Sequence, residues 1–294
     1  MKKFLNFLLE ILLYSLSYIP LWIFYLISDA CAFILCYVIR YRKKIILSNL
    51  TSVFPEKDEK EIKQIVKGFY KYFCDLVFES LKALTISPKQ LIKRFKITNP
   101  ELLDELKQNN ESAIIYAAHY GNWEWFGSLP LVRPYSFTAL YQEQTSQFFD
   151  ELILRMRSRF GVKCVESKYG YKTILQYKRD GIVSFNLIIG DQCPYYKASR
   201  SWVQFLGKET AFLKGAEVMA SKTGQVLLFP FIKVVKRGYY EVTFIKLTNS
   251  EDGIKDNGGI KEFARALEEN IRYAPQFWLW SHRRWKLKKR EGEL

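Results

Sequence analysis

The pattern of apolar and polar positions changes character near residue 97. Before this point, apolar residues run together or recur at helical spacing, and residues 58–81 predict one long amphipathic helix. After it, short apolar runs predict strands at residues 112–118, 136–141, 162–165, 182–189, 226–234 and 239–247. Amphipathic stretches predict helices at residues 123–131, 147–160, 171–179, 212–223 and 259–273.

Strands that alternate with helices predict an α/β fold, with a central mixed sheet flanked by helices. Two shorter helices are expected ahead of the sheet, at residues 45–54 and 88–95. The sequence has no internal repeat, low-complexity tract or obvious linker. We therefore expect an N-terminal hydrophobic, membrane-associated helical segment at residues 1–44, followed by one globular domain at residues 45–294.

The N-terminal segment is apolar over residues 4–28, where Glu10 is the only charged residue and Pro20 interrupts the run. It exceeds the roughly 20 apolar residues that a helix needs to cross a bilayer. A spanning helix, a re-entrant hairpin and a helix in the membrane interface all fit this pattern, as does a buried helix of a soluble core. We expect membrane contact, because few polar atoms face water. Basic residues flank both ends, so they give no orientation.

Composition narrows the possible partners. The formal net charge of +15 favours an anionic partner, which can be nucleic acid, anionic lipid or an acidic carrier protein. The apolar N-terminal segment and the absence of a groove-entering motif argue against nucleic acid, and the basic tail at residues 286–290 is expected to lie on anionic headgroups. The five cysteines are scattered without a C-x-x-C pair, which argues against disulfides and structural zinc. We expect reduced thiols, and neither a metal nor a cofactor.

One of the only two histidines, His119, stands where a predicted strand ends. The chain then turns at Gly121, and a helix is expected to start near Trp123. In open α/β sheets, ligands bind at the carboxyl ends of strands. Glu124 follows five residues later, and a strand–turn–helix junction can bring its carboxylate to the imidazole. Such a couple can take a proton from a substrate hydroxyl, although a lone histidine at a strand end is more often structural.

Two further regions carry candidate chemistry. Asp191 and Gln192 follow the predicted strand 182–189, so they are expected at the carboxyl end of that strand, where they could take part in the active site. The alternative is a structural role in a turn or as a helix cap. Near the C-terminus, Arg283 and Arg284 have the guanidinium geometry that holds phosphate. The alternative there is a solvated basic segment whose tryptophans snorkel.

Several blocks, in order along the chain, resemble the lipid A late acyltransferases, the lauroyl and myristoyl transferase group of the lysophospholipid acyltransferases. HYGNWEW resembles that family's His-x-x-x-x-Asp/Glu block. The other blocks are NLTSVFPE (49–56), the glutamate Glu79, GDQCP (190–194), FLG (205–207) and APQFWLWSHRRWK (274–286). The resemblance covers nearly the whole chain, and the combination is specific although each block alone is not.

The resemblance implies an O-acyltransferase on the cytoplasmic face of the bacterial inner membrane. It would move an acyl chain from acyl carrier protein, or from acyl-CoA, to a hydroxyl of a lipid A precursor. His119 would be the general base and Glu124 its partner. The other residues of the matching blocks, together with nearby basic residues, would bind substrate: Gly121 (through backbone amides near its turn), Asn122, Arg159, Lys163, Asp191, Gln192, His282, Arg283 and Arg284.

This sequence also departs from the family pattern. Gln276 stands where the C-terminal block has glutamate, and residues 141–143 lack a basic residue that the family often carries. These departures leave open another lipid acceptor, such as an aminolipid or a lysophospholipid. Ala118 and Glu124 favour the lipid A group over glycerol-phosphate acyltransferases, which usually carry asparagine and aspartate there.

Overall fold

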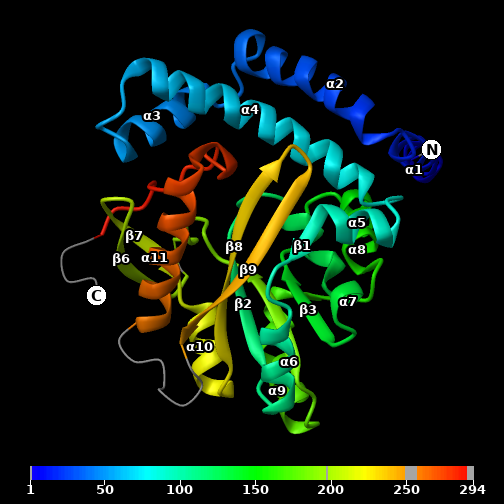
Figure 1. Ribbon diagram of the computed structural model, residues 1–294, viewed down its shortest axis with the longest axis vertical. Coiled ribbons are helices and arrows are strands. Elements are labelled where there is room, and N and C mark those ends of the chain that lie inside the picture. The colour runs from blue at the N-terminus through cyan, green and yellow to red at the C-terminus, as the bar shows by residue number, and fades with distance from the viewer. Residues whose placement is uncertain (1, 197, 249–256, 290–294) are drawn as a thin grey trace.

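The centre of the fold is a seven-stranded mixed sheet (Figure 1). The structure is a computed structural model, and it describes residues 2–196, 198–248 and 257–289. The strand order is β1-β9-β8-β2-β5-β3-β4. Only β8 and β9 pair antiparallel among these neighbours, which confirms the predicted mixed α/β sheet. The strands are β1 (Phe95–Ile97), β2 (Ala113–Ala117), β3 (Ser136–Tyr141), β4 (Lys163–Glu166), β5 (Ser184–Ile189), β8 (Val226–Lys236) and β9 (Tyr239–Thr248).

Helices flank the sheet, and most lie within a few residues of the predicted ranges (Figure 1). The long helix α4 begins at a capping box, in which Asp58 accepts from the Glu61 amide at 2.8 Å and Glu61 accepts from the Asp58 amide at 3.0 Å. The helices after the N-terminal region are α4 (Glu59–Lys82), α5 (Pro88–Arg94), α6 (Glu101–Gln108), α7 (Leu129–Val132), α8 (Gln147–Ser158), α9 (Ser167–Arg179), α10 (Gly215–Thr223) and α11 (Gly258–Tyr273), with 3-10 turns η2 (Trp123–Ser128) and η3 (Pro275–Phe277).

The prediction of a helix at residues 212–223 is wrong at its start. Phe212 lies in strand β7 (Lys208–Leu213), which pairs antiparallel with β6 (Arg200–Phe205) in a separate two-stranded sheet. Leu206 and Gly207 both have positive φ, 53° and 72°, so they form the tight two-residue turn of this hairpin. Strand β1 and helix α6 were not predicted, and the basic tail expected at residues 286–290 ends outside the described residues.

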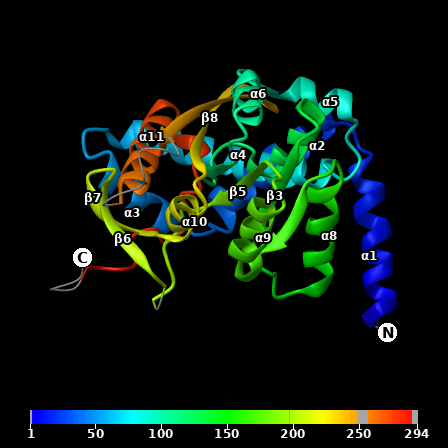
Figure 2. The same cartoon turned by 90° about the horizontal axis from the view of Figure 1, so that it is seen from below.

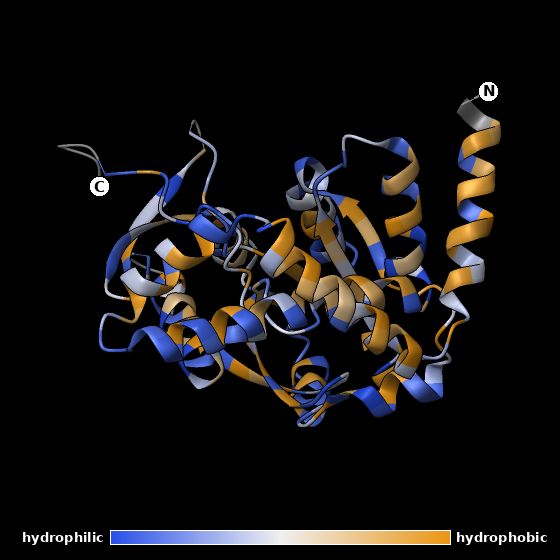
Figure 3. Cartoon of the chain, turned by 90° about the horizontal axis from the view of Figure 1, so that it is seen from above, coloured by the Kyte–Doolittle hydropathy of each residue, from blue (hydrophilic) through white to orange (hydrophobic). Residues whose placement is uncertain are grey.

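The apolar N-terminal segment is divided into several helices. It forms α1 (Lys2–Ser17) and α2 (Leu21–Phe33), with Pro20 at the break, and α2 continues through a π-helical turn, η1 (Ile34–Val38), before α3 (Lys43–Val53). Helix α2 runs along α4 (Figure 1), whereas α1 projects from the body (Figure 2) and is apolar on nearly all sides (Figure 3). Residues 21–38 form the one helix of the described chain that has the length and apolarity to cross a membrane.

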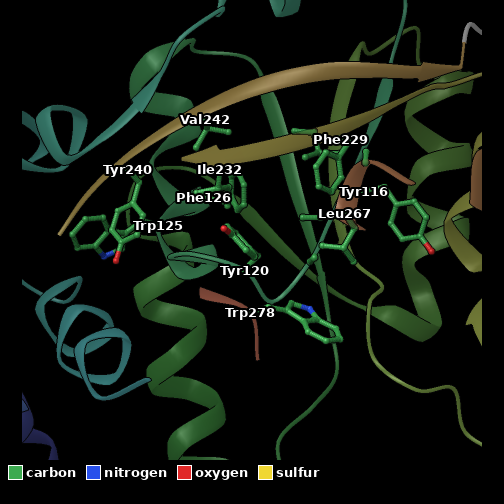
Figure 4. Close-up of a cluster of buried hydrophobic side chains, with 14 of the residues drawn as sticks. Tyr116, Tyr120, Trp125, Phe126, Phe229, Ile232, Tyr240, Val242, Leu267 and Trp278 are labelled. Carbon is green, nitrogen blue, oxygen red and sulfur yellow. The ribbon is translucent and has the colours of Figure 1, made fainter. Parts of the chain in front are cut away.

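The middle of the sheet lies in the hydrophobic core. All five residues of β2 are buried, as expected for a parallel strand whose two faces are covered. Aromatic residues dominate this core (Figure 4), and Tyr116 of β2 stacks on Phe263 of α11 with ring centroids 3.7 Å apart. Close packing around β2 fixes the position of the residues that follow it.

Candidate active site

His119 and Asp191 meet at the carboxyl edge of the sheet. Strands β2 and β5 are parallel neighbours, and their register pairs Ala117 with Ile189. The residue two positions beyond each strand therefore lies at the same level. His119 Nδ1 lies 2.6 Å from Asp191 Oδ1, and the Gly190 amide donates to the Ala117 carbonyl at 3.1 Å.

The hydrogen bond to Asp191 defines which imidazole nitrogen can act as a base. Burial alone would raise the pKa of Asp191, but the charge of His119 and hydrogen bonds from His119 and Trp278 outweigh it, so the pKa lies below its usual value. The ionised carboxylate accepts the Nδ1 proton, and Nε2 carries the lone pair. The Gln192 Nε2 atom lies 3.3 Å from that nitrogen. The His119 side chain is 20% exposed, so solvent or substrate reaches it.

The second oxygen of Asp191 is held by a residue that the sequence did not single out. Trp278 Nε1 donates to Asp191 Oδ2 at 2.8 Å, and the Trp278 backbone forms an antiparallel bridge with Tyr120. Trp278 is only 2% exposed, so the interpretation of the C-terminal tryptophans as snorkelling side chains is wrong for this residue. The one sequence feature that could have marked Trp278 as functional is its place in the C-terminal block that resembles the acyltransferases.

Gly121 shapes the turn after His119. Its φ is +58°, and a Cβ there would lie 2.7 Å from Ile232 Cγ2, so a larger residue would strain the turn. Its amide donates to the Phe277 carbonyl at 3.0 Å. The sequence predicts that backbone amides near this turn, or a nearby basic side chain, stabilise an oxyanion; of those amides, the one of Gly121 already has the Phe277 carbonyl as its acceptor.

Asn122 is fully buried and supports the turn from within the protein. Its Nδ2 donates to Glu79 Oε2 at 2.7 Å, and its Oδ1 accepts from the Trp125 amide at 3.2 Å, which caps η2. Both ends of the amide therefore have protein partners, and neither is presented to a substrate.

Glu124 does not pair with His119. Its carboxylate accepts two hydrogen bonds from Arg157 of α8, from Nε at 2.8 Å and from Nη2 at 2.7 Å, and one from Trp123 Nε1 at 3.1 Å. The expected pairing of His119 with Glu124 is thus replaced by the pairing with Asp191, since η2 directs Glu124 toward α8. Trp123 contacts both residues, because its Nε1 donates to Glu124 and its ring meets the His119 ring edge-on at 5.0 Å.

An apolar cavity of about 50 Å³ adjoins the Glu124–Arg157 pair. Trp123 lines it, and so does Ile189, the last residue of β5, so the cavity reaches the same edge of the sheet as the histidine. Its remaining walls come from η2, α7, β3, β5 and the residue just before β4: Phe126, Gly127, Leu129, Phe137, Thr138, Ala139, Leu140, Val162, Phe185 and Leu187.

The structure places Arg159 and Lys163 away from the histidine couple. Arg159 Nη1 donates to the carbonyls of Ala83 at 2.9 Å and Ile86 at 2.7 Å, just beyond the end of α4. Lys163 is exposed at the start of the edge strand β4, with its Nζ 5.3 Å from the ring centre of Tyr177. Among the described contacts, neither residue touches His119 or Asp191.

The C-terminal residues His282, Arg283 and Arg284 lie in different surroundings. His282 Nε2 accepts from the Cys193 amide at 3.1 Å, and burial lowers the pKa of His282 to about 4, so it is neutral and holds the loop after Asp191. Arg283 is exposed. Arg284 is 2% exposed, and its Nη2 donates to the Ala211 carbonyl at 2.7 Å; burial lowers its pKa to about 10. Its Nε and Nη1 have no hydrogen-bond partner among the described residues.

A histidine–carboxylate couple lies at the edge of the sheet that an apolar cavity also reaches. This arrangement is typical of an enzyme that deprotonates a hydroxyl group next to an apolar substrate. Comparison with known families agrees. A family model described as bacterial lipid A biosynthesis acyltransferase matches residues 1–287, and the chain belongs to this family. It is therefore an O-acyltransferase of this type.

Individual relatives are more distant. A lipid A biosynthesis acyltransferase of Haemophilus influenzae is 25% identical over 240 residues, which cover 79% of this chain and 72% of that protein. A lipid A biosynthesis myristoyltransferase of Escherichia coli K12 is 25% identical over 190 residues, which cover 63% of this chain and 57% of that protein. Lipid A biosynthesis acyltransferase 2 of Shigella flexneri is 24% identical over 148 residues, which cover 50% of this chain and 47% of that protein.

The Glu124–Arg157 pair gives a stability prediction. The side chains are 13% and 25% exposed, so removing one partner leaves the other charge largely desolvated. We expect Glu124→Leu to lower the free energy of unfolding by about 3 kcal/mol and Arg157→Met to do the same. The double variant should regain most of this loss. Denaturant unfolding of all four proteins measures it, and a double variant as unstable as the sum of the singles would contradict the prediction.

Proposed function

We propose that the protein transfers a fatty acyl group from acyl carrier protein, or acyl-CoA, to a hydroxyl of a lipid A precursor. The single observation that carries the proposal is the His119–Asp191 couple, at the same edge of the sheet that the apolar cavity reaches through Trp123 and Ile189. The names of the relatives, which refer to lipid A biosynthesis, support the acceptor. The apolar walls of the cavity suit the first part of an acyl chain.

In the proposed mechanism, His119 Nε2 takes the proton of the acceptor hydroxyl while Asp191 stabilises the resulting imidazolium. The acceptor oxygen attacks the thioester carbonyl and forms a tetrahedral oxyanion. Gln192 Nε2 lies 3.3 Å from His119 Nε2, where the acceptor hydroxyl is deprotonated, and we assign oxyanion stabilisation to it in place of the Gly121 amide. Collapse of the intermediate forms the ester and expels the thiolate, which takes the proton back from the imidazolium.

Charge supports the proposed donor and the proposed surface. The net charge of +15 favours an acidic carrier protein and anionic lipid headgroups. The five cysteines are free thiols, as suits a protein on the cytoplasmic face of the inner membrane. We assign membrane binding to residues 1–44 and acyl transfer to residues 45–294.

We further propose that α2 lies in the membrane interface and does not span the bilayer. Its inner face is bonded to the body, through Ser28 to Asp75 at 2.5 Å and Tyr25 to Glu79 at 2.9 Å. A helix held in this way cannot cross the bilayer while the body stays in water. Its outer face carries exposed apolar residues at helical spacing: Trp22, Leu26, Phe33 and, in η1, Tyr37. Such an amphipathic arrangement is typical of helices that lie in the interface.

The test of the function is acyl transfer by the purified, vesicle-bound protein. Lipid A precursor is offered together with acyl carrier protein or CoA thioesters of several chain lengths, and products are identified by mass spectrometry. We expect one added acyl group in ester linkage, with acyl carrier protein the better donor. Parallel reactions with an aminolipid and a lysophospholipid serve as controls. Transfer to one of them in place of the lipid A precursor would overturn the proposed acceptor, and no transfer to any lipid would overturn the proposed reaction.

A further inference from the structure

We propose that Glu79 is a positioning residue that ties the docking of α2 to the geometry of the turn after His119. The inference rests on the proposed function of His119 and adds a link between the membrane-facing helix and the catalytic group. It starts from a carboxylate that the sequence marked only by its resemblance to a family glutamate.

The Glu79 side chain, on α4, is fully buried and accepts hydrogen bonds from three different parts of the fold. Its Oε1 accepts from Tyr25 of α2 at 2.9 Å. Its Oε2 accepts from Tyr240 of β9 at 2.7 Å and from Asn122 of the histidine turn at 2.7 Å. One carboxylate therefore joins the apolar helix, the sheet and the active-site turn.

From Glu79, the network reaches the turn along two routes. Asn122, bonded to the carboxylate, caps η2, and it lies three residues after His119. Trp125 Nε1 donates to the Glu79 backbone carbonyl at 3.2 Å, and the Trp125 ring packs edge-on against Tyr240 (Figure 4). A shift of the Glu79 side chain therefore displaces the cap of η2.

Burial makes this network sensitive to the loss of a single donor. Desolvation raises the pKa of Glu79 to about 7, although the hydrogen bonds from Tyr240, Tyr25 and Asn122 oppose that rise. A buried carboxyl group is costly unless its hydrogen bonds are made. When one donor is removed, the carboxyl group must rearrange around the other two, one of which is Asn122.

Helix α2 has a second polar attachment that avoids Glu79. Ser28 of α2 donates to Asp75 of α4 at 2.5 Å. Arg237, at the β8–β9 turn, donates both to Asp75 and to Asp29, which lies on α2. Tyr25 and Ser28 are one turn apart on the same helix and both bond α4. Only Tyr25 reaches the network of the histidine turn, so the two residues form a matched pair for an experiment.

The experiment compares Tyr25→Phe with Ser28→Ala in the full chain, bound to vesicles of phosphatidylethanolamine and phosphatidylglycerol. Hydrogen exchange of peptides that cover residues 119–126 is measured together with kcat and KM. We expect Tyr25→Phe to speed exchange in this region and to lower kcat about tenfold with KM nearly unchanged, because small displacements of a catalytic group are costly. Ser28→Ala should leave both exchange and kcat near the wild-type values.

The outcomes separate positioning from simple docking. Equal losses of kcat in the two variants would show that Tyr25 only helps to hold α2, and unchanged exchange in Tyr25→Phe would show that no link exists; either result overturns the proposal. The exchange measurement needs no substrate. If the proposed catalytic role of His119 failed, faster exchange in Tyr25→Phe alone would still establish the link.

Discussion

Replacing His119 by alanine is expected to lower kcat by about 10³-fold, because the acceptor hydroxyl loses its general base. The other histidine, His282, cannot replace it, because burial lowers its pKa to about 4 and its Nε2 accepts from the Cys193 amide. Initial rates with acyl carrier protein thioester and lipid A precursor measure the effect. KM for the donor should change little, since the imidazole contributes to proton transfer more than to binding.

The control for His119→Ala is its behaviour outside catalysis. The side chain is 20% exposed and lies at the edge of the core, so the unfolding temperature should fall by only a few degrees and vesicle binding should not change. Added imidazole should restore part of the rate, because the deleted ring leaves space beside Asp191. A variant that turns over at the wild-type rate would rule out His119 as the base, and with it the proposed mechanism.

Most of the sheet could be predicted because its strands are local features of the sequence. The run at residues 113–117 is apolar throughout, which is typical of a strand buried on both faces, and His119 lies two positions beyond its end. The strand before Asp191 is apolar except at Ser184 and Asn186, and its first three residues are buried. The elements that were missed are short or weakly patterned, such as β1 with three residues and the hairpin of β6 and β7. Strand β1 pairs with β9, which is distant in the sequence, and β6 pairs with β7, which follows it. The periodicity of apolar residues does not show which segments pair.

The partner of His119 could not be deduced from local spacing. Glu124 is five residues away in the sequence, whereas Asp191 is 72 residues away, and only the strand order places β5 beside β2. The register of that parallel pair then brings Asp191 to the imidazole. Asp191 was nevertheless a candidate, because it follows a strand at the edge where ligands bind. The ion pair of Glu124 with Arg157 likewise depends on how α8 packs against η2.

Asp191→Asn is expected to lower kcat by about 10³-fold through the imidazole tautomer, with little effect on acceptor binding. One oxygen of Asp191 accepts from His119 Nδ1 and the other accepts from Trp278 Nε1. Asparagine has one acceptor oxygen and one donor nitrogen, while the Trp278 indole can only donate. The amide therefore turns its oxygen to Trp278 and its N–H to His119. The imidazole must then accept at Nδ1 and carry its proton on Nε2, where it cannot deprotonate a hydroxyl.

Trp278→Phe is the matched control, since it removes the second bond to Asp191 and leaves the carboxylate in place. We expect it to lower kcat only about tenfold, because Asp191 still fixes the tautomer but is less firmly oriented. Nitrogen-15 shifts of the His119 ring report the tautomer directly. They should show the proton on Nδ1 in the wild type and in Trp278→Phe, and on Nε2 in Asp191→Asn. If Asp191→Asn keeps the wild-type tautomer and rate, the carboxylate is not the group that prepares His119, and the couple at the sheet edge has no part in acyl transfer.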